Sequence, residues 1–198
     1  MTSAAAQNEP ISDETLAERV IKGDKDAFGG LIDRYEEKLT RYVKRFTQEK
    51  DDIDDLVQVI FIKAYTHLNA FDTTRSFNSW VYRIAHNESV NHLKRKGNQK
   101  ISFIDFDTML PHPFAKETSD DIAFKKEIQA MLEPHLAKLS PKYREVLILY
   151  YYDDLSYQEI GDVLSIPTST VGIRIRRGKE FLKKNLGENI TLQDYSTQ

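Results

Sequence analysis

The residues best suited to chemistry lie near the C-terminus, where two short helical segments meet at a tight turn. The first segment begins with a capping box, in which Ser156 is followed three residues later by Glu159. The turn spans residues 165–167, and Thr168 or Ser169 then caps a longer helix. This spacing is typical of a helix-turn-helix, whose second helix enters the major groove of DNA.

The second of these helices has one apolar side and one side suited to contact with DNA. At about 100° per residue, one narrow sector that we expect to be buried holds Val171, Ile175, Gly178 and Leu182. The opposite sector holds Ser169, Ile173, Arg176, Arg177 and Lys184, flanked by Gly172 and Arg174. Arginine can bind guanine edges or phosphates, and small residues permit close approach. DNA binding is therefore favoured over the alternative, an ordinary amphipathic helix with a basic solvent face.

The charge of the chain is divided between two basic segments and an acidic remainder. Residues 75–100 carry a net +5 and residues 165–186 carry another +5. Because the whole chain has a net charge of −3, the rest of it carries −13. Two separate cationic segments indicate two contacts with a polyanion such as nucleic acid. The alternative is that these side chains only solvate helix ends.

The composition excludes several classes of protein. The 198 residues are 40% hydrophobic and 30% charged, which is the balance of a globular protein. The absence of Cys excludes disulfides, thiolate metal sites and a Cys nucleophile. No apolar run approaches the roughly 20 residues of a membrane helix, and residues 1–10 lack the features of a secretion signal. We therefore expect a cytoplasmic protein without membrane insertion.

No set of residues predicts an enzyme. A nucleophile, base and orienting group are not found together, and the five His residues lack metal-ligand spacing. Residues 172–179 resemble a phosphate-binding loop only superficially, because the glycine spacing is wrong and Glu180 stands where a hydroxyl is needed. A cation site on the acids of residues 51–55 is the rival interpretation of that cluster, but Leu56 stands where a calcium loop needs glycine. We expect no catalysis, no cofactor, no metal and no small-molecule substrate.

Helical periodicity predicts an all-α fold of two small helical bundles joined by a flexible linker. Apolar residues recur at helical spacing over residues 28–46 and 53–68, and another helix is predicted to start near Ser76 or Asn78. Residues 97–121 lack this period and contain two Pro residues, which predicts a linker. The predicted organisation is a disordered N-terminus at 1–12, a first bundle at 13–97, a linker at 98–122, a second bundle with the helix-turn-helix at 123–187, and a C-terminal tail at 188–198.

Two sets of motifs, in order along the chain, resemble one known family. The first set consists of residues 54–58 with Phe61, Ala64 and Tyr65, then Phe77, residues 80–87 and residues 94–96. The second consists of residues 139–146, 155–160 and 167–171. They resemble the N-terminal and C-terminal domains of sigma factors of the sigma-70 family. Because no middle domain separates them, the chain resembles the extracytoplasmic-function (ECF) group.

The resemblance implies a sigma factor that binds core RNA polymerase and promoter DNA and directs promoter-specific transcription initiation. It implies that the C-terminal domain reads the −35 element as duplex through Ser169, Thr170, Gly172, Ile173, Arg174, Arg176, Arg177 and Lys179. It also implies that the N-terminal domain captures the −10 element as a melted single strand, for which stacking aromatics, cations and amides are needed. Residues that supply these groups are Phe71, Arg75, Trp80, Tyr82, Arg83, Asn87, Lys94 and Arg95. For each aromatic ring taken singly, and for Trp80 above all, core packing is the alternative and the commoner role. The loop at residues 69–78 corresponds to the segment in which relatives hold an extruded base.

The resemblance further implies protein partners for the N-terminal bundle. In this family the bundle docks on the polymerase clamp through the helix predicted here near residues 51–68, whose outward residues include Asp55, Gln58, Val59 and Ile62. Val59 and Ile62 are aliphatic on a side that would otherwise face water, which indicates a covering protein. An anti-sigma factor is a further expected partner. A dimeric activator or repressor is the rival function, but it leaves the aromatic and basic residues of the N-terminal bundle unused.

Overall fold

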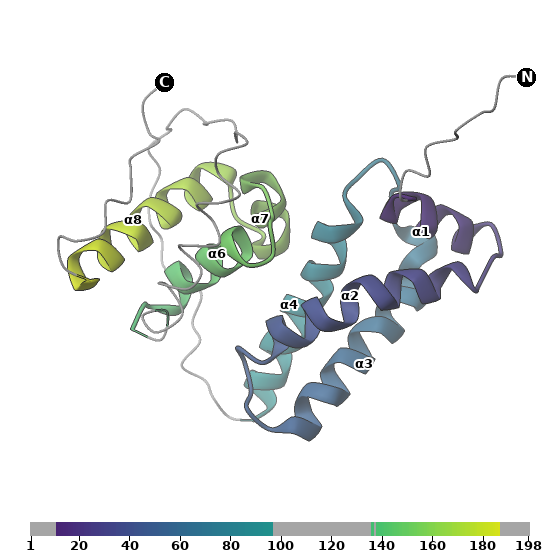
Figure 1. The fold of residues 1–198 in the computed structure, drawn as a ribbon, viewed down its shortest axis with the longest axis horizontal. Helices are drawn as coiled ribbons and strands as arrows, with labels where there is room; N and C mark the ends of the chain where they lie inside the picture. Colours follow the sequence, from purple (N-terminus) through teal and green to yellow (C-terminus); the bar gives the residue numbers. More distant parts are fainter. Residues whose placement is uncertain (1–10, 97–135, 137, 187–198) are drawn as a thin grey trace, which may run out of the picture. The chain divides into compact units, whose positions relative to one another are not determined.

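The computed structural model describes residues 11–96, 136 and 138–186, and every regular element within them is a helix (Figure 1). The predicted all-α class is therefore confirmed. Contacts divide the chain into two units, with the division between His92 and Leu93. The predicted linker at 98–122, the predicted C-terminal tail at 188–198 and most of the predicted N-terminal segment at 1–12 lie outside the described residues, and the predicted domain boundaries stay predictions. In the part of the chain that is described, no helix is both long and apolar enough to cross a membrane.

Among the described residues, the N-terminal unit contains four α-helices and a short 3-10 helix, and the last of the α-helices extends just past the division. They are α1 (Asp13–Ile21), α2 (Ala27–Val43), α3 (Lys50–His67), η1 (Leu68–Ala70) and α4 (Phe77–Arg95). Ser12 caps α1, since its hydroxyl accepts a hydrogen bond of 3.1 Å from the backbone N–H of Thr15. Gly23 follows α1 with φ of +106°, a conformation that other residues rarely adopt, and so turns the chain toward α2.

The core of this unit lies where α2, α3 and α4 face one another. Leu39 of α2 and Ile60 of α3 are completely buried, as their periodicity predicted. Aromatic rings in edge-to-face contact join α2 to α4, because Tyr35 packs on Phe77 with ring centroids 5.4 Å apart. The unit is therefore held mainly by interlocking apolar faces of three helices.

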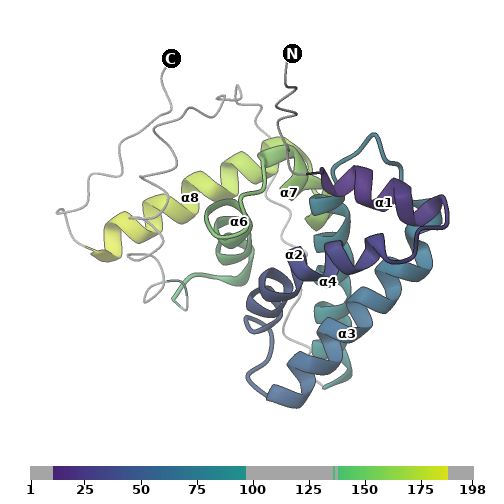
Figure 2. The ribbon, with the colours of Figure 1, turned by 45° about the vertical axis from the view of Figure 1, so that its right-hand side comes forward.

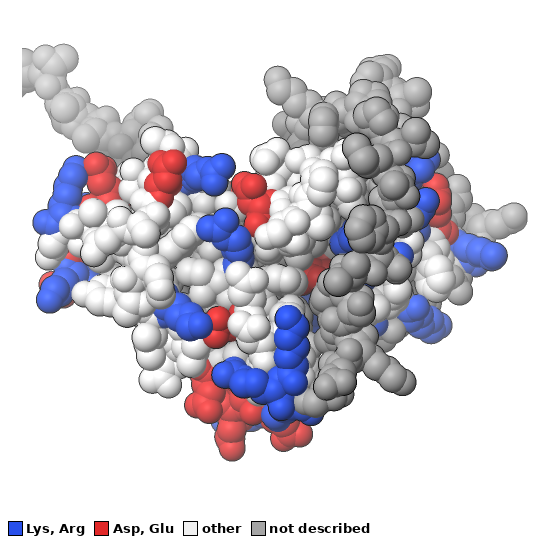
Figure 3. Space-filling view, turned by 180° about the vertical axis from the view of Figure 1, so that it is seen from behind, with Lys and Arg blue, Asp and Glu red and all other residues white. Residues whose placement is uncertain are grey.

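Polar contacts set the alignment of α3 and α4. Lys63 Nζ lies 2.6 Å from Glu88 Oε1, and the Glu88 side chain is only 11% exposed. His92 Nε2 lies 3.4 Å from Asp52 Oδ2, which places the start of α3 beside the end of α4. Figure 3 shows acidic side chains with Lys and Arg next to them at the lower edge of the molecule, the end at which α3 begins and α4 ends in Figure 1.

The C-terminal unit contains α6 (Pro141–Tyr151), α7 (Tyr157–Leu164) and α8 (Thr168–Leu186). Figure 2 shows α7 at the N-terminal end of α8, and α8 contacts both α6 and α7. The predicted capping box of α7 is confirmed, because Ser156 N donates to Glu159 Oε2 at 2.9 Å and Glu159 N donates to Ser156 Oγ at 3.3 Å. α7, the turn and α8 therefore form the helix-turn-helix that the sequence predicted.

The turn between α7 and α8 requires a residue without a side chain at position 161. Ser165 ends α7 in the left-handed conformation, with φ of 55°. The backbone N–H of Ile166 then donates to the carbonyl oxygen of Gly161 at 3.1 Å. A Cβ atom at position 161 would lie 2.9 Å from the carbonyl oxygen of Ile166, which is closer than real Cβ contacts allow.

We predict that Gly161→Ala destabilises the helix-turn-helix by about 1–3 kcal/mol, because the Ile166 carbonyl belongs to the backbone and cannot move without opening the turn. Native-state hydrogen exchange of the α7 amides measures this change. The matched control is Gly172→Ala, whose Cβ would only make ordinary contact with the Tyr157 ring at 3.7 Å. That control should gain about 1 kcal/mol from helix propensity. Equal exchange rates in the Gly161→Ala variant and the unmodified chain would contradict the role of this glycine.

Candidate nucleic-acid and protein interfaces

The predicted division of α8 into a buried and an exposed side is confirmed. Val171 and Leu182 are completely buried and Ile175 is 1% exposed, whereas Arg176 and Arg177 are exposed on the other side. The shorter residues of the predicted DNA-binding set, Ser169, Thr170, Gly172 and Ile173, are half-buried. This side of α8 thus combines two cations with residues that leave room for a close approach.

Two cations of the predicted set do not share this exposed side. Arg174 is only 6% exposed, so its predicted contact with DNA is wrong. The sequence already indicated that Arg174 is buried, since at 100° per residue Arg174 lies about 40° around the helix axis from Gly178, on the buried side. Lys179 is half-buried, with Nζ 5.6 Å from the centroid of the Tyr151 ring and 5.9 Å from that of Tyr150. Its charge is directed toward the aromatic residues of α6.

The outer face of α4 gathers most of the polar residues predicted for the N-terminal unit. Arg83, Asn87 and Arg95 are exposed along one stripe at a spacing of four or eight residues, and Lys94 is exposed beside them. Asn91, which is not among the predicted residues, is exposed on the same stripe. Its spacing of four from Asn87 was the available signal. The stripe therefore offers cations for phosphates and amides for base edges.

The predicted aromatic residues lie mostly in the core. Tyr82 is completely buried and packs on Tyr42, with ring centroids 5.3 Å apart. Phe71 is 6% exposed and lies 5.6 Å from Phe77 and 5.0 Å from Trp80, between ring centroids. The predictions that Tyr82 and Phe71 stack on bases are therefore corrected, because neither ring has a free face. Trp80 is half-buried and keeps part of its surface at the edge of this cluster.

The loop between η1 and α4 is an ordered turn built on Asp72. Its Oδ1 atom accepts hydrogen bonds from Thr74 N at 3.0 Å and Thr74 Oγ1 at 2.7 Å. The backbone N–H of Arg75 also donates to the Asp72 carbonyl at 2.9 Å. The hydrogen bond from the Thr74 side chain, followed by that from its backbone, lowers the pKa of Asp72 below its usual value. The turn holds Arg75 exposed at the start of the α4 face.

An open groove of about 570 Å³ runs between α2 and α3. Apolar residues that line it are Phe28, Ile32, Val57, Phe61, Ile62 and Tyr65, and polar ones include Glu36, Asp54 and Gln58. Of the four predicted polymerase-binding residues it brings together Gln58 and Ile62, whereas Asp55 and Val59 are exposed on α3 outside the lining. Within the described residues, no group of three or more His, Asp and Glu side chains is placed to hold a metal ion.

Tyr65 differs from its predicted position in the core. It is 41% exposed and packs on Phe28, with ring centroids 5.0 Å apart, at the edge of the groove. Ile62 and Val59 are 54% and 37% exposed, so the face of α3 beside the groove is strongly apolar. An apolar surface of this kind is typical of a protein interface.

Comparisons with known proteins define the class to which this arrangement belongs. The family model of Sigma-70 region 2 matches residues 31–99, and that of Sigma-70 region 4 matches residues 130–182. The ECF RNA polymerase sigma factor SigW of Bacillus subtilis is 35% identical over 85% of this chain and 93% of its own length. The ECF RNA polymerase sigma-E factor of Escherichia coli is 34% identical over 88% of this chain and 94% of its own length.

A solved structure agrees with these matches. CnrH, determined in complex with the cytosolic domain of CnrY, is 28% identical with a TM-score of 0.63, and the match covers 90% of this chain and 99% of CnrH. The chain therefore belongs to the extracytoplasmic-function group of the sigma-70 family. It is a sigma factor, a protein that gives core RNA polymerase its promoter specificity, and not an enzyme.

We predict that Thr74→Val raises the pKa of Asp72 toward its usual value, because the variant loses the hydroxyl donor and keeps the backbone donor. Since the native pKa is lowered, the turn is favoured above the unfolded pKa and weakens as the pH falls through the folded pKa, so it is insensitive to pH near neutrality. Carboxyl NMR titration of Asp72 measures the shift, with Thr73→Val as the control. An unchanged Asp72 midpoint in Thr74→Val would refute this assignment.

Proposed function

We propose that this sigma factor reads the −35 promoter element as duplex through α8 and the −10 element as a melted single strand through α4 and the loop before it. The observation that carries the proposal is the exposure of Arg176 and Arg177 on α8, opposite a seam that is completely buried at Val171 and Leu182. A recognition helix needs this arrangement, because one side must hold the unit together while the other enters the major groove.

The contact with the −10 strand uses the outer stripe of α4. Arg83 and Arg95 neutralise phosphates, and Asn87 and Asn91 offer amides to base edges. Trp80 contributes the one partly exposed ring of the predicted aromatic set, and Arg75 meets the strand from the preceding loop. The structure therefore favours a contact based on cations and amides, with less base stacking than the sequence suggested.

The groove between α2 and α3 is the proposed docking surface for core RNA polymerase. Its apolar lining and the exposed Ile62 and Val59 beside it would be covered in the holoenzyme, while Gln58 and Asp55 would add polar contacts. We also propose that an anti-sigma factor binds this protein. CnrH, whose structure matches this chain, was solved with the cytosolic domain of a second protein, CnrY.

The decisive experiment is transcription from a promoter library with core polymerase and this protein. Promoters selected in run-off assays then provide templates in which either element is duplex or single-stranded. We expect the holoenzyme to require a duplex −35 element and to bind templates whose −10 element keeps only the non-template strand. Tight binding of the free protein as a dimer to a palindrome, without transcripts above core alone, would favour the rival repressor.

We predict that Arg176→Ala weakens holoenzyme binding to the selected −35 duplex by about 1–3 kcal/mol and relaxes base preference at one position. Competition binding with −35 variants measures both effects. The control is Lys138→Ala, which removes the same charge from an exposed position in the same unit. Equal losses in the two variants would mean that Arg176 contributes only general electrostatic attraction.

We predict that Ile62→Glu weakens capture of core polymerase by about tenfold or more, because it introduces a charge into the centre of a desolvated interface. Ile62 is 54% exposed in the free protein, so the fold should tolerate the change. Ile21→Glu, at an α1 position that is 37% exposed, is the matched control. Affinity is measured with immobilised core enzyme, and unchanged capture by Ile62→Glu would disprove docking through the groove.

A further inference from the structure

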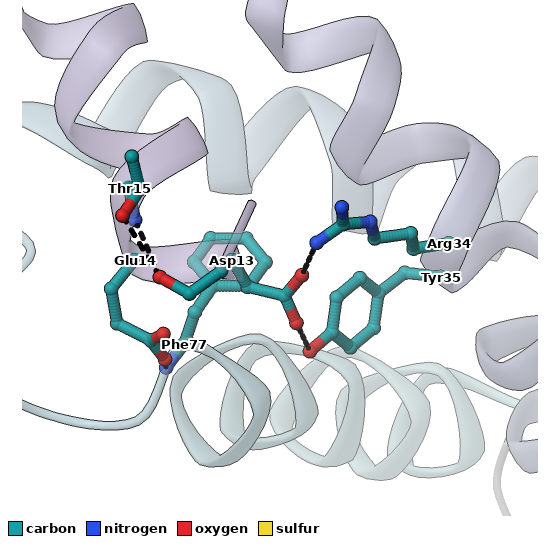
Figure 4. A network of polar contacts seen from close by, with 7 residues as sticks. Asp13, Glu14, Thr15, Arg34, Tyr35 and Phe77 are labelled. Atoms are coloured by element: carbon teal, nitrogen blue, oxygen red, sulfur yellow. Dashed lines mark hydrogen bonds and ion pairs between the residues drawn. The ribbon is translucent and has the colours of Figure 1, made fainter. Parts of the chain in front are cut away.

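Helix α1 contacts both ends of the loop that precedes α4. The loop runs from Phe71 to Ser76, between η1 and the first residue of α4. α1 packs against η1 at the start of the loop. At the other end, Glu14 Oε1 accepts a hydrogen bond of 2.9 Å from the backbone N–H of Phe77 (Figure 4). Helix α1 therefore holds both ends of this loop in place.

The bond from Glu14 caps α4 from a distant part of the chain. Phe77 is the first residue of α4, and its N–H is one of the four that have no partner within the helix. A carboxylate at this end also interacts favourably with the helix dipole. The Phe77 ring is 1% exposed and packs on Tyr35, so the start of α4 is fixed both by its ring and by its amide.

The support for Glu14 is itself rigid. Its neighbour Asp13 accepts hydrogen bonds from Tyr35 Oη and from Arg34 Nη1, both at 2.5 Å, which ties the start of α1 to α2 (Figure 4). Ser12 caps α1 one residue earlier. Because Tyr35 is 1% exposed, this attachment reaches into the core of the unit. Glu14 is thus held in place by contacts that do not involve the loop.

We propose that Glu14 is a positioning residue for base selection in the −10 strand. By fixing the first amide of α4 relative to η1, it sets the path of residues 71–76 and so the geometry in which Arg75 and the Asp72 turn meet a base. This inference rests on the proposed function of the loop as part of the −10 contact. Glu14 touches no DNA in this account, since its carboxylate is directed at the Phe77 amide.

The test measures base discrimination by the holoenzyme rather than binding alone. Templates carry a duplex −35 element and a single-stranded non-template −10 element, with each −10 base replaced in turn. Glu14→Leu removes the acceptor, and we expect the affinity ratio between the preferred and disfavoured base at the position nearest the loop to fall about fivefold. Glu14→Gln keeps an oxygen acceptor at the same reach and should retain the ratio of the unmodified protein.

A second pair of variants separates positioning from stability. Glu14→Asp keeps the charge but shortens the side chain by one methylene, so we expect a partial loss of discrimination and faster hydrogen exchange of the Phe77 amide. Glu18→Leu is the matched control, since Glu18 is an exposed glutamate of α1 that pairs only with Lys22 at 2.7 Å among the described contacts. It should leave both the ratio and the exchange rate unchanged.

Two results would overturn the inference, and they can be told apart. If Glu14→Leu weakens binding to all templates equally, or lowers the melting temperature without changing the ratio, Glu14 only stabilises the unit. If the unmodified holoenzyme discriminates no −10 base, the proposed strand contact fails and the role of Glu14 fails with it.

Discussion

The ion pair between Lys63 and Glu88 fixes how α3, which lines the groove, and α4, which carries the exposed cations and amides, lie against each other. Glu88 is nearly buried, and an ionised carboxylate in that position is tolerated only with a close partner. Lys63 stands on α3, the helix that contributes part of the groove lining, and Glu88 stands on α4, between the exposed Arg83 and the exposed Lys94 and Arg95 near the end of that helix. A shift of α4 along α3 would separate the charges, so the pair holds the protein-binding helix and the strand-binding helix in one alignment.

Both units use the same arrangement for a helix that meets nucleic acid. α4 and α8 each bury one side and present cations on the other. The exceptions show the limit of this arrangement. Arg174 and Lys179 lie near the boundary of the buried side of α8, and packing rather than DNA determines their environment.

The periodicity and caps of the sequence predicted most of the described fold. The Ser156 and Glu159 box and the turn at residues 165–167 are local signals, and both are found where expected. These predictions succeeded because caps and turns depend on residues within four positions of one another.

The predictions for aromatic residues failed for a physical reason. Tyr82 and Phe71 have types that suit base stacking, but both are covered by other rings. Tyr82 packs on Tyr42 of α2, which is distant in sequence, and Phe71 packs on Phe77 across the loop between η1 and α4, a contact that residue spacing does not show. Tyr65 shows the opposite error, because it was expected in the core and is exposed. It lies on the apolar stripe of α3, but the sequence does not show that a groove between α2 and α3 leaves its ring open to solvent. Glu14 was not selected either, because a cap supplied by another helix has no signature in sequence spacing.

The groove beside α3 has a consequence for handling the free protein. A patch in which Ile62 and Tyr65 are exposed to water beside Phe28 lowers its free energy when any apolar surface covers it, including that of a second molecule. Concentrated samples will therefore tend toward self-association, and mild detergent or arginine in the buffer will oppose it. For the same reason, coexpression with a protein that covers this patch is a practical route to homogeneous material.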